Sequence, residues 1–178
     1  MDYFLLKQDK RYSNTPQIID LFKNINTRDL NLLRADNIED NNCIYVKSND
    51  NIDYLDILDI QIFLVSKNLK KILEKYNRNM IFKMLILIDY EKKEQNVYYL
   101  PIFEEIEALS EKSEFNLNKT IVKKIVLDEK KIKNKKIFKI KESDKTLIVV
   151  RLDAAESLLR RDFEGIALER LEVEKVKE

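Results

Sequence analysis

The segment TLIVVRLDAAESLLRRDFEGIALERLEV, residues 146–173, constrains the fold of this chain more than any other part of the sequence. Leu147 to Val150 is an apolar run rich in β-branched residues, which is typical of a strand buried on both faces. Asp153 then stands where a side-chain oxygen can accept hydrogen bonds from the first amides of a helix. Glu156, three residues later, can complete a capping box. A strand followed directly by a helix is therefore expected here.

The single glycine of the chain, Gly165, stands shortly after this expected helix. Apolar residues recur at helical spacing as far as Phe163, and Gly165 can adopt the left-handed conformation that commonly ends a helix. From Ile166 to Val173 apolar and charged residues alternate over much of the length, as in a half-buried strand. We expect a helix from Asp153 to Phe163 and a second strand after it.

A second helix and a hairpin are predicted in the middle of the chain. Ser66 is a good N-cap residue, and the apolar positions after it recur at intervals of three and four, so we expect an amphipathic helix from Ser66 to Asn77. The segment IFKMLILIDY contains the continuous apolar run Met84 to Ile88, which predicts a central strand covered on both faces. The polar turn EKKEQN and the segment Val97 to Phe103 complete a hairpin.

Shorter patterns predict the other elements. Asp2 to Lys7 is an opening strand, and the pair Thr15-Pro16 is a plausible helix start. Cys43 to Val46 is the clearest strand in the polar region that follows. The acidic segment Glu104 to Glu114 holds one helical turn, and Ile137 to Ile140 is a strand that turns into the strand of the opening segment.

Together these elements predict a single α+β domain with a mostly antiparallel sheet and a few amphipathic helices. At 178 residues the chain is near the usual size of one domain. Polar clusters interrupt the apolar patches before residue 60. We therefore expect an irregular N-terminal lobe over residues 1–59 that is continuous with a core over residues 60–178.

The composition excludes several kinds of site. Histidine is absent, and Cys43 is the only cysteine. No Ser-His or Cys-His nucleophile and no imidazole metal centre can form within this chain. One glycine is too few for a phosphate-binding loop, so we expect no cofactor. Without a histidine beside it, Cys43 is expected to be a small buried hydrophobe rather than a nucleophile.

Acidic residues gather in two places. The first group is Asp50, Asp53, Asp56 and Asp59, and the second is Glu104, Glu105 and Glu107. The spacing of three in the first group could place oxygen ligands around a hard cation, but it lacks the glycine turn and terminal glutamate of a calcium loop. The second group could hold a catalytic carboxylate pair, although neighbours in sequence do not form a cleft by themselves. A solvated acidic face that binds a partner is the expectation for both groups.

The segment from Lys123 to Lys141 is rich in lysine and could contact phosphates. It contains no arginine, no recognition helix and no platform of stacking aromatic residues. Nucleic-acid binding is therefore an alternative and not the first expectation. In the hairpin, Tyr98 and Tyr99 place one ring on each side of a strand, so one is expected in the core while the other is a candidate anchor for a partner.

The second half of the chain resembles a bacterial family of immunity proteins of polymorphic toxin systems, immunity family eleven. Four segments between Phe63 and Leu171 carry the resemblance: FLVSKNLKKILEKY, YYLPIFEEIEALSEKSE, VLDEKKIKNKKIFKIKE and IVVRLDAAESLLRRDFEGIALERL. The resemblance implies a cytoplasmic protein that binds and neutralises a cognate toxin. It brings no catalytic motif with it.

These observations lead us to expect a non-enzymatic binding protein. The net charge is +1, so a partner is expected to recognise a local patch rather than a global field. The sequence shows no secretory signal pattern and no apolar run long enough to cross a membrane, which agrees with a cytoplasmic location. A nucleic-acid-binding or regulatory module is the alternative, followed by an enzyme that depends on carboxylates or a metal.

Overall fold

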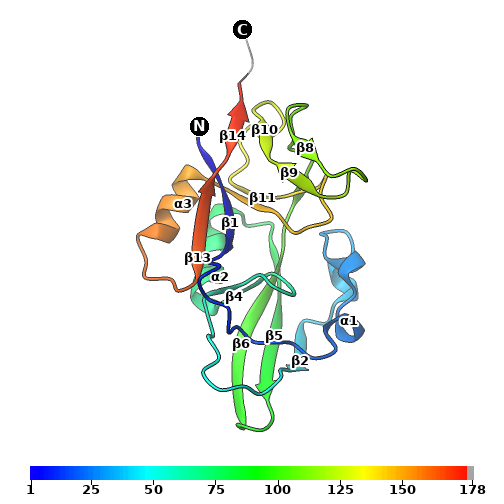
Figure 1. Cartoon of the computed structure of the whole chain (residues 1–178), viewed down its shortest axis with the longest axis vertical. Coiled ribbons are helices and arrows are strands. Elements are labelled where there is room, and N and C mark those ends of the chain that lie inside the picture. Colours follow the sequence, from blue (N-terminus) through cyan, green and yellow to red (C-terminus); the bar gives the residue numbers. More distant parts are fainter. Residues whose placement is uncertain (176–178) are drawn as a thin grey trace.

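The computed structural model describes residues 1–175 and confirms an α+β domain in which strands predominate (Figure 1). A first five-stranded sheet has the order β13-β1-β12-β11-β7, and a second has the order β2-β5-β6-β4-β3. Most strand pairs are antiparallel, but β2 and β5, β7 and β11, and β10 and β14 run parallel. The expected α+β class and the predominance of antiparallel pairing are both confirmed.

The bounds of the elements are as follows. The first sheet comprises β13 (Ile166–Arg170), β1 (Tyr3–Gln8), β12 (Ile148–Arg151), β11 (Ile137–Ile140) and β7 (Glu105–Ile106). The second comprises β2 (Asn41–Tyr45), β5 (Ile81–Asp89), β6 (Glu94–Ile102), β4 (Leu64–Val65) and β3 (Ile57–Leu58). Two smaller sheets pair β8 (Glu114–Phe115) with β9 (Val122–Lys124) and β10 (Val126–Asp128) with β14 (Glu172–Glu174). The helices are α1 (Leu21–Asn24), α2 (Lys67–Tyr76) and α3 (Leu152–Leu159).

Three clusters of buried apolar residues hold these layers together. The first lies between α2, α3 and the two sheets, with Leu69, Val150 and Leu158 among its members. The second joins one face of the second sheet to the chain around α1, and the third joins the remaining face of the first sheet to the segment before β11. Both sheets contain strands from either side of residue 59. The expected N-terminal lobe is therefore interleaved with the rest of the chain.

Several local predictions are confirmed. Ser66 is the N-cap of α2, where its hydroxyl oxygen accepts a hydrogen bond from the amide of Leu69 at 3.2 Å. β5 and β6 form the expected antiparallel hairpin, and β1 is the expected opening strand. Of the helices described in residues 1–175, none is long and apolar enough to span a membrane.

The helix in the segment 146–173 differs from the prediction. α3 begins at Leu152 and ends at Leu159, not at Phe163, and its N-cap is Arg151. Asp153 lies in the first turn, where the Arg151 guanidinium binds both of its carboxylate oxygens at 2.8 and 2.7 Å. Glu156 pairs with Arg160 at 3.5 Å instead of completing a capping box. Because Asp153 pairs with Arg151 and Glu156 pairs with Arg160, neither carboxylate caps the helix.

Three other predictions are wrong. No helix begins at Thr15-Pro16, because Ile18 forms a bridge with Val46 and the chain reaches α1 only at Leu21. The segment from Glu104 forms strand β7 rather than a helical turn, because it pairs with β11. The Glu142 carboxylate accepts hydrogen bonds from the amides of Ala108 and Leu109, which follow β7. Cys43 is exposed.

Candidate protein-binding surface

The first acidic group does not converge on one site. Asp50 is exposed in a loop, whereas Asp56 accepts hydrogen bonds from the Ser66 hydroxyl and, at 2.9 Å, from the amide of Glu164. Asp56 therefore joins the start of α2 to the loop before β13. Within residues 1–175, no group of three or more Cys, Asp and Glu side chains is arranged to hold a metal ion.

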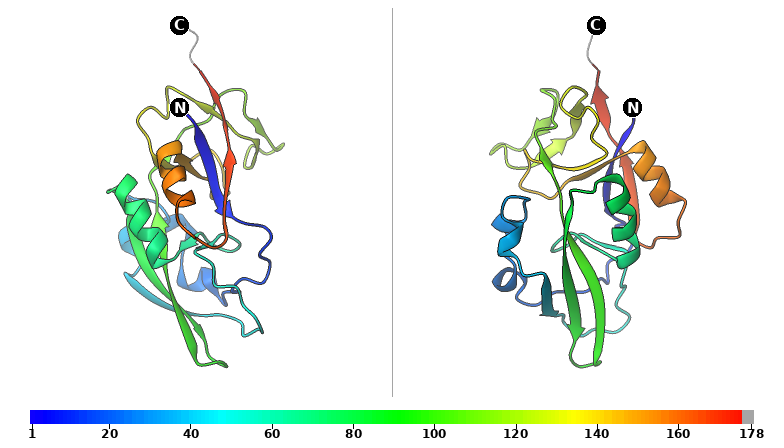
Figure 2. Two further views of the ribbon diagram at one scale, coloured as in Figure 1. Left: turned by 90° about the vertical axis from the view of Figure 1, so that its left-hand side faces the viewer. Right: turned by 180° about the vertical axis from the view of Figure 1, so that it is seen from behind.

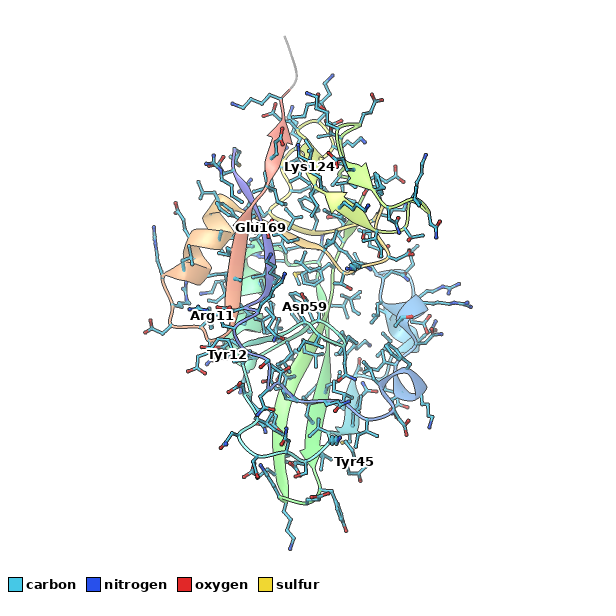
Figure 3. The ribbon with its side chains drawn as sticks, in the orientation of Figure 1. Arg11, Tyr12, Tyr45, Asp59, Lys124 and Glu169 are labelled. Carbon is cyan, nitrogen blue, oxygen red and sulfur yellow. The ribbon has the colours of Figure 1, made fainter. Side chains whose placement is uncertain are left out.

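Asp59 is a partly buried member of this group. It is half-buried near the middle of the molecule (Figure 3), and its amide donates to the Gln8 side chain at 3.0 Å. Burial raises the pKa of the Asp59 carboxyl from 3.8 to about 7, because the charged form loses hydration. Asp53 is also half-buried, and its amide bonds to the Asn14 carbonyl at 2.8 Å.

The second acidic group pairs with the lysine-rich segment. Glu104, Glu105 and Glu107 lie 2.5, 2.8 and 2.8 Å from the ammonium nitrogens of Lys135, Lys139 and Lys141, respectively. The hydrogen bond from Lys141 lowers the pKa of Glu107. The two segments that appeared as separate acidic and basic faces in the sequence therefore compensate each other, because β7 and β11 are neighbours. This pairing leaves less free charge on either segment for an external partner.

A partly exposed apolar face lies on the second sheet. Strand pairing aligns Cys43 with Ile86 and Val97, and Tyr45 with Ile88, so these side chains lie together on one face. We call this set, with Met84, the open face. Its exposed members are Tyr45 at 52%, Val97 at 44% and Cys43. The other face of the same strands carries buried residues such as Leu85, Leu87 and Tyr98.

None of the residues of the open face belongs to a buried cluster of the described chain. The positions that border them on these strands include Asn41, Phe82, Gln95 and Tyr99. The strands therefore place no charged side chain of their own on this face, although 37% of the residues of this protein are charged. An apolar area that contains aromatic and methionine side chains and lacks charge has the composition of the centre of a protein interface.

Helix α2 covers only one end of this side of the sheet. There the Lys70 ammonium group lies 5.1 Å from the centre of the Phe82 ring and 5.0 Å from that of Tyr99, within the range of a cation–π contact. The β5–β6 hairpin continues well beyond the end of α2 (Figure 2), and Tyr45 lies toward that end (Figure 3). The open face begins where the cover of the helix ends.

The sequence predicted part of the open face. The expectation that one of the two adjacent tyrosines is buried is correct: Tyr98 is buried and donates to the Leu55 carbonyl at 2.7 Å, while Tyr99 lies on the opposite side. The prediction that Met84 to Ile88 is covered on both faces is wrong, because Met84, Ile86 and Ile88 are only half-buried. Cys43 and Tyr45 were missed, since only the parallel pairing of β2 with β5 brings them beside this run.

Comparison of the chain with models of known protein families and with curated proteins finds no match.

Proposed function

We propose that this protein acts by binding another protein, as a cytoplasmic immunity-type protein that neutralises a cognate bacterial toxin through direct contact. One observation carries the proposal: the uncharged, partly exposed open face of β2, β5 and β6, which no buried cluster of the described chain includes. Burying such a face against a partner removes apolar area from water, which is the main favourable term in most protein associations.

The chemistry of the face also indicates the kind of partner. A ligand that fits it presents an apolar surface, because Tyr45, Val97 and the half-buried isoleucines offer no charge to pair with. Tyr45 supplies a large ring of low conformational entropy, the type of residue that dominates binding energy in many interfaces. The segment of residues 63–171 resembles immunity proteins, and this resemblance supports a toxin as the partner.

The test is neutralisation of the toxin encoded beside this protein in its native genome. We expect the wild-type protein to restore growth when it is co-expressed with that toxin and to co-purify with it. The double variant Tyr45→Lys/Val97→Lys is expected to weaken binding at least about tenfold, because it places two charges in a face that becomes desolvated.

The matched control is Leu33→Lys/Leu117→Lys, which adds the same two charges at apolar residues that are 97% and 102% exposed elsewhere. This control should bind like the wild type, and circular dichroism of both variants checks that they fold. If the wild-type protein neither binds nor neutralises the toxin, the immunity function is wrong. If it does both and the open-face variant is unaffected, the function stands and the surface is wrong.

A further inference from the structure

Helix α2 carries further cationic side chains besides Lys70. Lys71, Lys75 and Arg78 follow one another at intervals of four and three, so they lie along one side of the helix and its end. All three are exposed. Together with Arg161, from the turn after α3, they line a surface groove of about 860 Å³.

Within the described part of the chain, the cations of this groove have no acidic partner. In residues 1–175, none of Lys71, Lys75 and Arg78 forms an ion pair, whereas the neighbouring Lys70 pairs with Glu74 at 2.7 Å. The Arg161 guanidinium donates to the Ser157 hydroxyl at 2.8 Å, which positions it at the wall of the groove without neutralising its charge. Positive charge that is not compensated within the fold is available to an anionic ligand.

The groove is not uniformly basic. Asp56, Glu74 and Asp162 also line it, and Lys70 compensates Glu74. Four cations therefore face the two carboxylates of Asp56 and Asp162, so that an excess of positive charge remains. The apolar part of the lining consists of Ile72, which is buried, and Phe163, which is half-buried.

We propose that this groove binds a short acidic segment of a protein. Carboxylate side chains of the segment pair with Lys71, Lys75, Arg78 and Arg161, and an apolar side chain packs on Phe163. A peptide can place its charges between Asp56 and Asp162, whereas the continuous row of phosphates in a nucleic acid would meet both carboxylates. This arrangement favours a polypeptide over a polynucleotide.

The inference goes beyond the proposed function, because it concerns a second surface and the charge of its ligand. It can fail while toxin binding by the open face stands, and the reverse also holds. Its test uses a synthetic probe, so the identity of the toxin does not enter.

The experiment measures fluorescence anisotropy of a labelled peptide of alternating Glu and Leu residues with the full-length protein. We expect saturable binding that weakens as salt is added, and no binding of the same peptide with Gln in place of Glu. The variant Lys71→Glu/Lys75→Glu/Arg78→Glu should weaken binding at least about tenfold. The control Lys130→Glu/Lys133→Glu/Lys136→Glu makes the same change in net charge at exposed lysines elsewhere and should change binding less than about twofold.

Three results would overturn the proposal. Equal loss of binding in both triple variants would mean that only net charge matters. Equal binding of the Gln peptide would remove the role of carboxylates. Tighter binding of a single-stranded DNA oligonucleotide, lost in the groove variant and not in the control, would assign the groove to nucleic acid. Thermal unfolding of each variant shows whether a loss of binding reflects a loss of fold, and the single variant Lys75→Glu then provides the milder test.

Discussion

Glu105 of β7 and Lys139 of β11 lie directly opposite each other in a parallel strand pair, with 2.8 Å between the carboxylate oxygen and the ammonium nitrogen. The pair is partly shielded from solvent, since the two side chains are 31% and 20% exposed. It is the middle one of three Glu–Lys pairs that join the acidic segment to the lysine-rich segment. The edge of the first sheet is therefore held by charge pairs as well as by backbone hydrogen bonds.

Exchanging the charges of this pair tests its contribution. We expect Lys139→Glu to lower the free energy of unfolding by about 1 kcal/mol, because it places two like charges opposite each other on neighbouring strands. The double variant Lys139→Glu/Glu105→Lys should recover most of that loss. Urea denaturation of the single and double variants measures both values. No recovery in the double variant would mean that the two charges do not interact in solution.

Asp59 makes the stability of the protein depend on pH. The pKa of its carboxyl is about 7 in the folded protein, against 3.8 ordinarily. Between about pH 4 and about pH 7 the folded state keeps a proton that the unfolded state has released, so stability falls as the pH rises and levels off above pH 7. Over this pH range the ionisation of Asp59 should lower the free energy of unfolding by about 2–4 kcal/mol.

The variant Asp59→Asn should remove this dependence and be more stable than the wild type at pH 8. Chemical denaturation at a series of pH values measures the free energy of unfolding of both proteins. Asp50→Asn, at an exposed loop carboxylate, is the control and should keep the wild-type profile. A wild-type stability that rises from pH 5 to pH 7 and is unchanged by Asp59→Asn would contradict the prediction.

Gly165 cannot accept a side chain without strain. Its φ is +77°, and a Cβ atom built there would lie 2.6 Å from Leu55 Cδ1 and 2.8 Å from Leu55 Cβ. We expect Gly165→Ala to lower the free energy of unfolding by about 2–4 kcal/mol, because alanine is strained in a left-handed conformation and its methyl group overpacks against Leu55. Thermal unfolding measures the cost. In a Leu55→Ala background the same substitution should cost less, because part of the overlap is gone. An equal cost in both backgrounds would assign the effect to the backbone alone.

Local patterns predicted much of the fold because their causes are local. Ser66 caps α2 with its own hydroxyl, and the hairpin of β5 and β6 needs only a polar turn between two apolar runs. The position of α3 was predicted, but its ends were not. The Asp153 carboxylate pairs with Arg151 instead of capping the helix. Gly165 lies in the turn directly before β13 and not at the end of the helix.

The candidate surfaces were predicted poorly because they depend on which strands become neighbours. The acidic residues Glu104, Glu105 and Glu107 were expected to face a partner, yet the pairing of β7 with β11 places lysines beside them. The helical spacing after Ser66 predicted the apolar side of α2 but gave no role to its cations Lys71 and Lys75. Within residues 1–175 neither of these two lysines forms an ion pair, and this is a property of the surrounding chain that helical spacing cannot reveal.

The sequence by itself determined the class of fold, the amphipathic helix, the hairpin and the absence of imidazole chemistry, because propensity, capping and composition act over a few residues. Only the tertiary structure decided which charges are compensated and which apolar residues remain uncovered. Both depend on strands that are distant in sequence, as when β2 places Cys43 and Tyr45 beside Ile86 and Ile88. A side chain's burial and charge environment are set by its neighbours in space, and the free energy of packing the whole chain selects those neighbours.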